Sequence, residues 1–422
     1  MANKNVGIPS LFRQLLFWVL VAIVAGALIG MIPGLPKGFI SPFATFNDIF
    51  GKFLSFCIPL IILGLVGPAL ADLGRGAGKW LLATVAIAYG STLFAGFGTY
   101  GIASVIFPRI LTESAPELKE PKNAVASLLG DNLNITPVLD VTGALILAFI
   151  LGICMAALNT PTLHRAYSEF RDITMLMIKR AIVPLLPLFI FGTFLNMSYS
   201  GQIALVIKVM IKVILVSVIL TVVLLLLQYT VAGAIAKVNP FTALGRMAKA
   251  YFTALGTASS AATIPVTYQC ARNNGVSAEI AGFTIPLCAT IHLGGSTVKI
   301  TAFALAVMQM TGQSVTFGKM AMAIIILGIT MVAAPGVPGG AIAAAQGVLM
   351  GFLGFSPELY SLMVALYVAI DSVGTATNVT GDGAIALVVN KLAGGSLGSE
   401  KGHAMATAET MAVSYTHLRA HE

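Results

Sequence analysis

The stretch of sequence that decides the fold is DSVGTATNVTGD, residues 371–382, inside the otherwise apolar run 357–392. Asp371 and Asp382 are eleven residues apart, which is about three helical turns, so both carboxylates fall on nearly the same helix face. A charge at membrane depth costs at least ~2.5–3.5 kcal/mol on insertion scales and therefore needs a partner, an ion or water. Carboxylate, hydroxyl and amide oxygens on one face suit a hard monovalent cation and an ammonium group.

The composition places that stretch in a membrane. Of 422 residues, 57% are hydrophobic and only 9% are charged, whereas a soluble domain carries roughly a quarter charged residues. Uncharged runs such as 213–236 and 320–357 are long enough to cross a hydrocarbon core, which needs about 20 helical residues. We predict an all-α polytopic membrane protein, in which the apolar run 15–31 is the first membrane helix rather than a cleaved signal.

The apolar pattern predicts spans, at 11–32, 53–70, 80–107, 141–158, 181–197, 203–236, 278–310 and 357–392. Two further segments, 252–266 and 320–353, are apolar but interrupted, the first by GTASSAATIP and the second by APGVPGG. Backbone groups freed by such breaks must be buried in protein or line a wet cavity, which favours re-entrant helical hairpins around a binding site. Two kinked spanning helices are the alternative, since small residues also favour tight helix packing.

The net charge is +8, and the basic residues lie in short clusters in every second connection between apolar runs. This positive-inside pattern predicts a cytoplasmic N-terminus, and it makes nucleic acid an improbable partner. We expect the bacterial cytoplasmic (inner) membrane. The basic clusters are Lys4 and Arg13, then Arg75 and Lys79, then Arg165, Arg171, Lys179 and Arg180, then Lys237, Arg246 and Lys249.

The cysteines, Cys57, Cys154, Cys270 and Cys288, stand singly in apolar surroundings. Their spacing matches neither a disulfide framework nor a metal site, so we expect buried free thiols. The glycine pairs Gly26 with Gly30 and Gly347 with Gly351 indicate close helix packing.

Motifs in the last third of the chain resemble those of the dicarboxylate/amino acid:cation symporter family, also called the glutamate transporter family. NVTGD at 378–382, preceded by Asp371, is similar to the family's last-helix signature. SSAATIP at 259–265 and GVPG at 336–339 are similar to its two hairpin tips, in the same order. The resemblance covers residues 10–395 and implies eight transmembrane helices plus two re-entrant hairpins. It also implies a homotrimer that works by an elevator movement.

The resemblance also implies roles for particular residues. Asp382 and Asn378 would bind sodium with carbonyls near Thr290 and His292, and a second sodium would lie on carbonyls around Val332, Ala333 and Ala334. Asp371 would take the substrate's α-ammonium, and Asn378 with Ser259 and Ser260 its α-carboxylate. Thr375 would touch the substrate side chain. Gly374, Val337 and Gly339 would line the same pocket.

Two departures from the family pattern change the expected chemistry. Acidic-substrate members carry an arginine where this chain has Gly374, and a guanidinium is the natural partner of a second carboxylate. A neutral or small polar amino acid is therefore favoured, unless Lys299 reaches the pocket. Gly294 replaces an aspartate of a third sodium site, for which Tyr89 and Thr92 are further candidates. We expect fewer than three coupled sodium ions.

Lys299 and His292 are candidate coupling residues. The ammonium of Lys299 would act as a built-in cation, or pair with Asp382 or Asp371, or form a purely structural salt bridge. A buried lysine readily loses its proton and histidine titrates near neutrality, so proton coupling stays open. His292 is either a hydrogen-bonded structural group or part of transport.

The interpretation as a whole is a sodium-coupled amino acid importer and not an enzyme. Its alternatives are a cation- or proton-coupled dicarboxylate transporter and, in another class, an anion channel. Residues 1–240 would form mainly the scaffold, with the third span contributing to transport, and 241–395 the transport core. Residues 396–422 would be a tail whose last nine residues resemble translated adapter sequence. The expected partners are the substrate, lipids and two further copies of the chain.

Overall fold

A computed structural model of the chain describes residues 15–74, 79–111, 127–128, 135–139, 141–158, 160–201, 203–332, 334 and 339–395. Those residues form helices and contain no strand, so the predicted all-α class is confirmed. The tail at 396–422, most of the segment 112–134 and Arg75 lie outside the described residues. The elements are α1 Leu15–Gly30, α2 Lys37–Gly74, α3 Lys79–Leu111, α4 Val141–Ala157, α5 Pro161–Met177, η3 Ile178–Ile182, α6 Val183–Tyr199, α7 Ile203–Ala236, α8 Pro240–Arg246, α9 Ala248–Thr257, α10 Ser260–Asn273, α11 Ala278–Ile291, α12 Gly294–Met310, α13 Phe317–Val332, α14 Gly340–Ala344, η4 Gly347–Phe352, α15 Pro357–Ala369 and α16 Asp371–Leu392.

Several helices have the length and apolarity needed to cross a membrane. Among the described residues five continuous stretches qualify, and the bent pair α15 and α16 makes a sixth if counted as one span. The apolar window of Ala278–Met310, which joins α11 and α12, is wholly buried inside the protein. A span that does not face lipid belongs to the centre of the molecule, where a polar site can be shielded.

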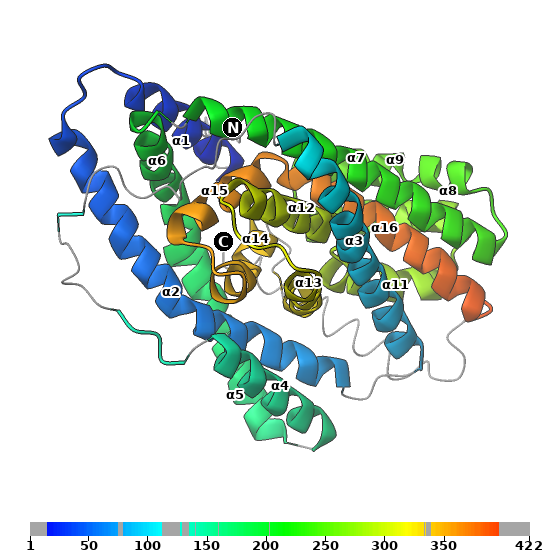
Figure 1. Ribbon diagram of the computed structural model, residues 1–422. Helices are drawn as coiled ribbons and strands as arrows, with labels where there is room; N and C mark the ends of the chain where they lie inside the picture. The colour runs from blue at the N-terminus through cyan, green and yellow to red at the C-terminus, as the bar shows by residue number, and fades with distance from the viewer. Residues whose placement is uncertain are drawn as a thin grey trace, which may run out of the picture.

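The first half of the chain packs around α2. This long helix contacts α4, α5 and α6, and α1 lies along α6 (Figure 1). Glycines allow the close approach of α1, because a Cβ at Gly26 would lie 2.7 Å from Phe191 O and one at Gly30 would lie 2.6 Å from Leu195 O. Ser198 Oγ also donates to Ala27 O over 2.6 Å. Gly26 and Gly30 thus act as the predicted packing residues.

The second half of the chain packs around α16. Helices α7, α9, α10, α11 and α12 all contact it, and Figure 1 shows α12 and α14 in the middle of the helices. The interruption predicted near 256–265 lies between α9 and α10, where Ala258 has a left-handed φ of 48°. The second interruption falls between the end of α13 at Val332 and the start of α14 at Gly340, and most of it lies outside the described residues. The first interrupted segment therefore breaks where the small residues predicted.

The span 278–310 is interrupted at His292 and Leu293, where the family resemblance implies an unwound helix. The predicted span 357–392 is wrong as a single helix, because it is bent by 61° at Ile370. Ile370 has φ −126° and ψ 26°, outside the helical range, and Asp371 opens a new helix directly after it. Apolar periodicity could not show this bend because β-branched Ile370 continues the hydrophobic run without interruption.

The sequence pattern also missed α5. This helix passes through the π-helical turn η3 into α6, so 161–199 is one continuous helical stretch rather than a span that begins at 181. Charges such as Arg165 and Asp172 lie on α5, and they hid it from a search based on apolarity.

Three of the cysteines are buried, as expected, but Cys154 is exposed. The prediction for Cys154 was wrong because it lies on an exposed part of α4, together with Ile150 and Ile153.

We predict that Gly26→Ala destabilises the fold, because the added methyl meets backbone atoms of α6 that a rotamer change cannot move. Overpacking of this kind costs about 1–3 kcal/mol, and thermal unfolding in detergent should show a lower midpoint. Gly98→Ala on α3 is the matched control, since a Cβ there meets nothing within 4 Å. Equal midpoints for the two variants would contradict the role given to Gly26.

Candidate functional site

The helix breaks at His292 and at Ile370 lie beside α16, because both α12 and α15 contact that helix. A break leaves amide N–H groups and carbonyls without helical partners, and buried groups of this kind need other ones. The side chains that supply those partners form two groups of polar contacts on α16, one around Asp382 and one around Asp371.

Asn378 joins α16 to the start of α12. Its Oδ1 accepts from Gly295 N over 2.8 Å and from Ser296 N over 3.4 Å, and its Nδ2 lies 3.2 Å from Ser296 Oγ. Leu293, the residue before α12, provides no side-chain cap, so Asn378 caps this helix from another element. Tyr367 Oη donates to the same Ser296 Oγ over 3.0 Å. Hydrogen bonds therefore link the buried start of α12 to both α15 and α16.

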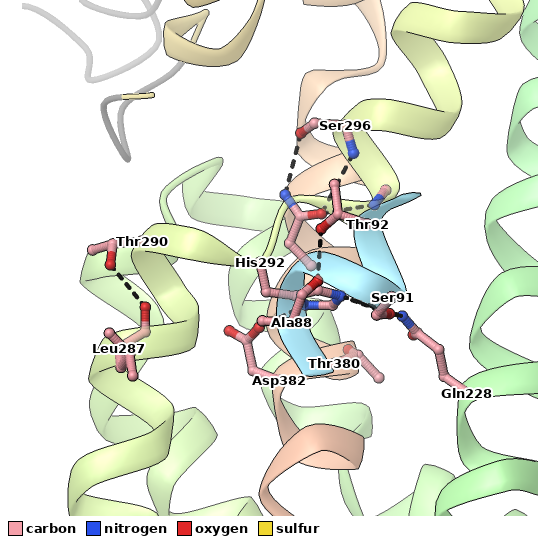
Figure 2. A network of polar contacts seen from close by, with 12 residues as sticks. Ala88, Ser91, Thr92, Gln228, Leu287, Thr290, His292, Ser296, Thr380 and Asp382 are labelled. Atoms are coloured by element: carbon pink, nitrogen blue, oxygen red, sulfur yellow. Dashed lines mark hydrogen bonds and ion pairs between the residues drawn. The ribbon is translucent and has the colours of Figure 1, made fainter. Parts of the chain in front are cut away.

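His292 and Asp382 form a buried pair, with 2.9 Å between Nδ1 and Oδ1 and 1% exposure for each side chain. Figure 2 shows the far edge of the imidazole pointing at Ser91, with Gln228 beyond it. His292 Nε2 lies 3.2 Å from Ser91 Oγ and 3.3 Å from Gln228 Nε2, and Gln228 Nε2 donates to Ser91 Oγ over 2.9 Å. Side chains from α3, α7 and α16 thus surround one imidazole at the α11–α12 break.

Two protonation arrangements fit these contacts. In the neutral form, Nδ1–H donates to Asp382 while Nε2 accepts from Ser91 or Gln228, which leaves one uncompensated negative charge on Asp382. In the imidazolium form the pair is neutral. Asp382 Oδ2 and Thr380 Oγ1 are buried without a hydrogen-bond partner in the described part of the chain. A buried carboxylate oxygen without a partner is costly, and with the neutral imidazole it has the charge that attracts a cation.

The second group lies at the bend between α15 and α16. Asp371 Oδ2 accepts from Gly339 N over 2.7 Å, and Asp371 Oδ1 lies 3.6 Å from Lys299 Nζ. Lys299 is 0% exposed, and its ammonium also donates to Ile370 O over 3.1 Å and to Asp371 O over 3.3 Å. Of the pairings predicted for Lys299, the structure shows the one with Asp371, whereas Asp382 pairs with His292.

Gly374 creates the space for Lys299. A Cβ at this position would overlap the Cε and Nζ atoms of Lys299. The lysine ammonium therefore lies where a side chain on residue 374 would begin. Gly381 does the same for the other pair, because a Cβ there would lie 2.6 Å from His292 Cε1.

The remaining predicted site residues have local contacts. Ser259 Oγ accepts from Ala262 N at the start of α10, and Ser260 is buried beside it. Thr375 Oγ1 donates to Asp371 O, and Thr290 Oγ1 to Leu287 O (Figure 2). Val332 ends α13. Ala333 and Val337 lie outside the described residues.

The candidates for a third ion site each donate to a backbone carbonyl. Tyr89 Oη donates to Ile325 O over 3.3 Å, while Thr92 Oγ1 donates to Ala88 O over 3.0 Å within its own helix (Figure 2). No described hydrogen bond links either side chain to Gly294.

Sequence reasoning missed Ser91, Gln228, Tyr367 and Tyr229. Tyr229 donates to Thr380 O over 2.8 Å and so contacts the same turn of α16 as Asp382. Gln228 carried a signal that could have been used, since it follows the run LLLL at 224–227 and a buried amide needs partners. Ser91 and the two tyrosines have no such signal, because hydroxyl groups are common in membrane helices.

Buried carboxylates held beside helix breaks define a class: the protein is a polytopic α-helical membrane protein with a polar site in its interior. Within that class, residues 15–392 match the model of the sodium:dicarboxylate symporter family, and the chain belongs to this family. Excitatory amino acid transporter 1 of Rattus norvegicus is 31% identical over 159 residues. Those residues are 37% of this chain and 29% of the relative. The Homo sapiens protein of the same name gives the same values. The match therefore spans less than a third of these relatives.

We predict that Asn378→Leu destabilises the protein, because it leaves the N–H groups of Gly295 and Ser296 buried without a partner. Each lost partner costs about 1–3 kcal/mol, which should lower the thermal midpoint clearly. Gln269→Ala removes an amide from an exposed contact with Asn273, and it should change the midpoint little. If both variants unfold at the same temperature, Asn378 does not cap α12.

Proposed function

We propose that the chain is a secondary active symporter that imports an amino acid, neutral or small and polar, together with sodium. The observation that carries the proposal is Asp371, a buried carboxylate at the α15–α16 bend that accepts from Gly339 N at the second interrupted segment. A carboxylate in this position favours an ammonium group and repels a second acidic group. The matched relatives are excitatory amino acid transporters, which supports an amino acid substrate.

Asp382 and Asn378 are the proposed ligands of one sodium ion, with carbonyls around Thr290 and His292. Oxygen donors suit a hard cation, and the unpartnered Asp382 Oδ2 supports a cation beside it. A second sodium would use carbonyls of the Val332 and Ala333 region. Gly294 offers no carboxylate, so fewer than three sodium ions are proposed.

The movement that we propose is an elevator, in which residues 241–395 move past a scaffold formed mainly by residues 1–240 within a homotrimer. Its support is the family membership and the dense polar linkage between α12 and α16, which would keep the substrate and ion ligands together during movement. The proposed setting is the bacterial cytoplasmic membrane with the N-terminus inside. Ser259, Ser260, Thr375, Gly374 and Val337 complete the proposed substrate pocket.

One observation favours a second candidate, a cation-coupled dicarboxylate carrier. Lys299 brings a positive charge to Gly374, the position at which the acidic-substrate members carry an arginine. If the lysine leaves Asp371 when substrate binds, its ammonium can bind a substrate carboxylate. The two candidates differ in the role of Asp371. A dicarboxylate has no ammonium group to pair with the carboxylate of Asp371, which would repel it.

The test is uptake of radiolabelled amino acids and dicarboxylates into proteoliposomes, with and without an inward sodium gradient. We expect sodium-driven accumulation of a neutral or small polar amino acid. Uptake of succinate or malate with no amino acid transported would reject the role of Asp371 and establish the second candidate. Accumulation driven by a proton gradient alone would show that protons are the coupled ion and would make Lys299 or His292 the coupling residue.

We predict that Asp371→Asn and Asp382→Asn act differently in this assay. Losing one partner of a buried charge pair costs about 2–5 kcal/mol, so Asp371→Asn should weaken apparent substrate affinity about 30-fold or more. Asp382→Asn should abolish the response to sodium. Asp48→Asn is the matched control, since Asp48 pairs with Lys52 on α2 and its loss should leave uptake unchanged.

A further inference from the structure

The environment of Lys299 is that of a coordinated cation. Its ammonium lies near two backbone carbonyls, Ile370 O at 3.1 Å and Asp371 O at 3.3 Å, and 3.6 Å from Asp371 Oδ1. The Tyr367 ring covers another side, with Nζ 3.8 Å from its centroid. Carbonyls, a carboxylate and an aromatic face are the groups that bind small monovalent cations.

The protein backbone, rather than the lysine alone, makes this environment. The 61° bend ends α15 at Ala369, and the negative end of a helix dipole favours a cation at the carbonyls that follow. Gly374 leaves the space in which Nζ lies. Both the bend and the glycine belong to other elements than α12, so the space and its acceptors remain when the lysine is removed.

We propose that the α15–α16 bend is a binding site for a small monovalent cation, and that this chain fills it with its own Lys299 ammonium. The ligand class is potassium-sized or ammonium-sized cations. Because the occupant is tethered, the wild-type chain needs no soluble cation here, and the substrate ammonium proposed for Asp371 would take the place of the Lys299 ammonium beside that carboxylate. A purely structural ion pair would explain the contact with Asp371, but it does not require the two carbonyls and the aromatic ring to gather around the same nitrogen.

The test is chemical rescue of Lys299→Ala, measured as the thermal midpoint of the purified full chain. Potassium, ammonium and sodium chloride are titrated from 1 to 100 mM, with choline chloride keeping the ionic strength constant. In Lys299→Ala the midpoint should rise by about 2 °C or more in potassium or ammonium chloride, and by less in sodium chloride. The wild type should not show this rise, and any cation effect at Asp382 cancels because both chains share it.

Two further variants make the result decisive. Lys299→Gln keeps most of the packed stem and adds an amide oxygen, so it should show the same cation response if the alanine variant fails to fold. Lys319→Ala is the matched control, because the Lys319 ammonium donates to Leu353 O away from Asp371, and it should gain no cation response. Midpoints of both Lys299 variants that are independent of cation would overturn the proposal. The readout does not depend on uptake, so failure of the transport proposal would remain distinguishable.

Discussion

The structure depends on the electrostatic cost of placing charge inside a membrane protein. Asp371, Asp382 and Lys299 are all buried, and each would be prohibitively unstable alone. The fold meets this cost with polar groups at the helix breaks. Gly339 N donates to Asp371, and Ile370 O accepts from Lys299. The imidazole of His292, at the α11–α12 break, pairs with Asp382. The helix breaks therefore supply partners to the buried charges.

The same constraint explains why the interior is organised around α16. Polar links run from this helix to α11 through His292 and to α12 through Asn378, and glycines let these neighbours approach closely. In the first half of the chain, α2 instead packs on α6 through apolar side chains such as Phe50 and Phe189. The polar linkage accordingly concentrates in the part of the chain proposed to carry the substrate, while the other part provides packing.

Much of this was predictable from residues 371–382, because two aspartates in an apolar run demand partners and the interrupted segments indicate where backbone groups are free. Lys299 and His292 were recognisable for the same reason. The identity of each partner could not be predicted. Whether Lys299 pairs with Asp371 or with Asp382 depends on the bend at Ile370, and an isoleucine in an apolar run gives no sign of a bend. Ser91 and Gln228 come from helices far apart in the chain, and only tertiary packing brings them to His292. Helix α5 was not predicted, because its outward-facing charges interrupt the apolar pattern.

Gly374 also has an evolutionary meaning. The ammonium of Lys299 fills the volume that a side chain on residue 374 would need, so the two positions cannot both carry long side chains. A descendant that acquires an arginine at 374 must first shorten residue 299, and a descendant that loses the lysine leaves a hole beside a glycine. Positions 299 and 374 are therefore coupled by their shared volume, and they should covary among related chains although 75 residues separate them in the sequence.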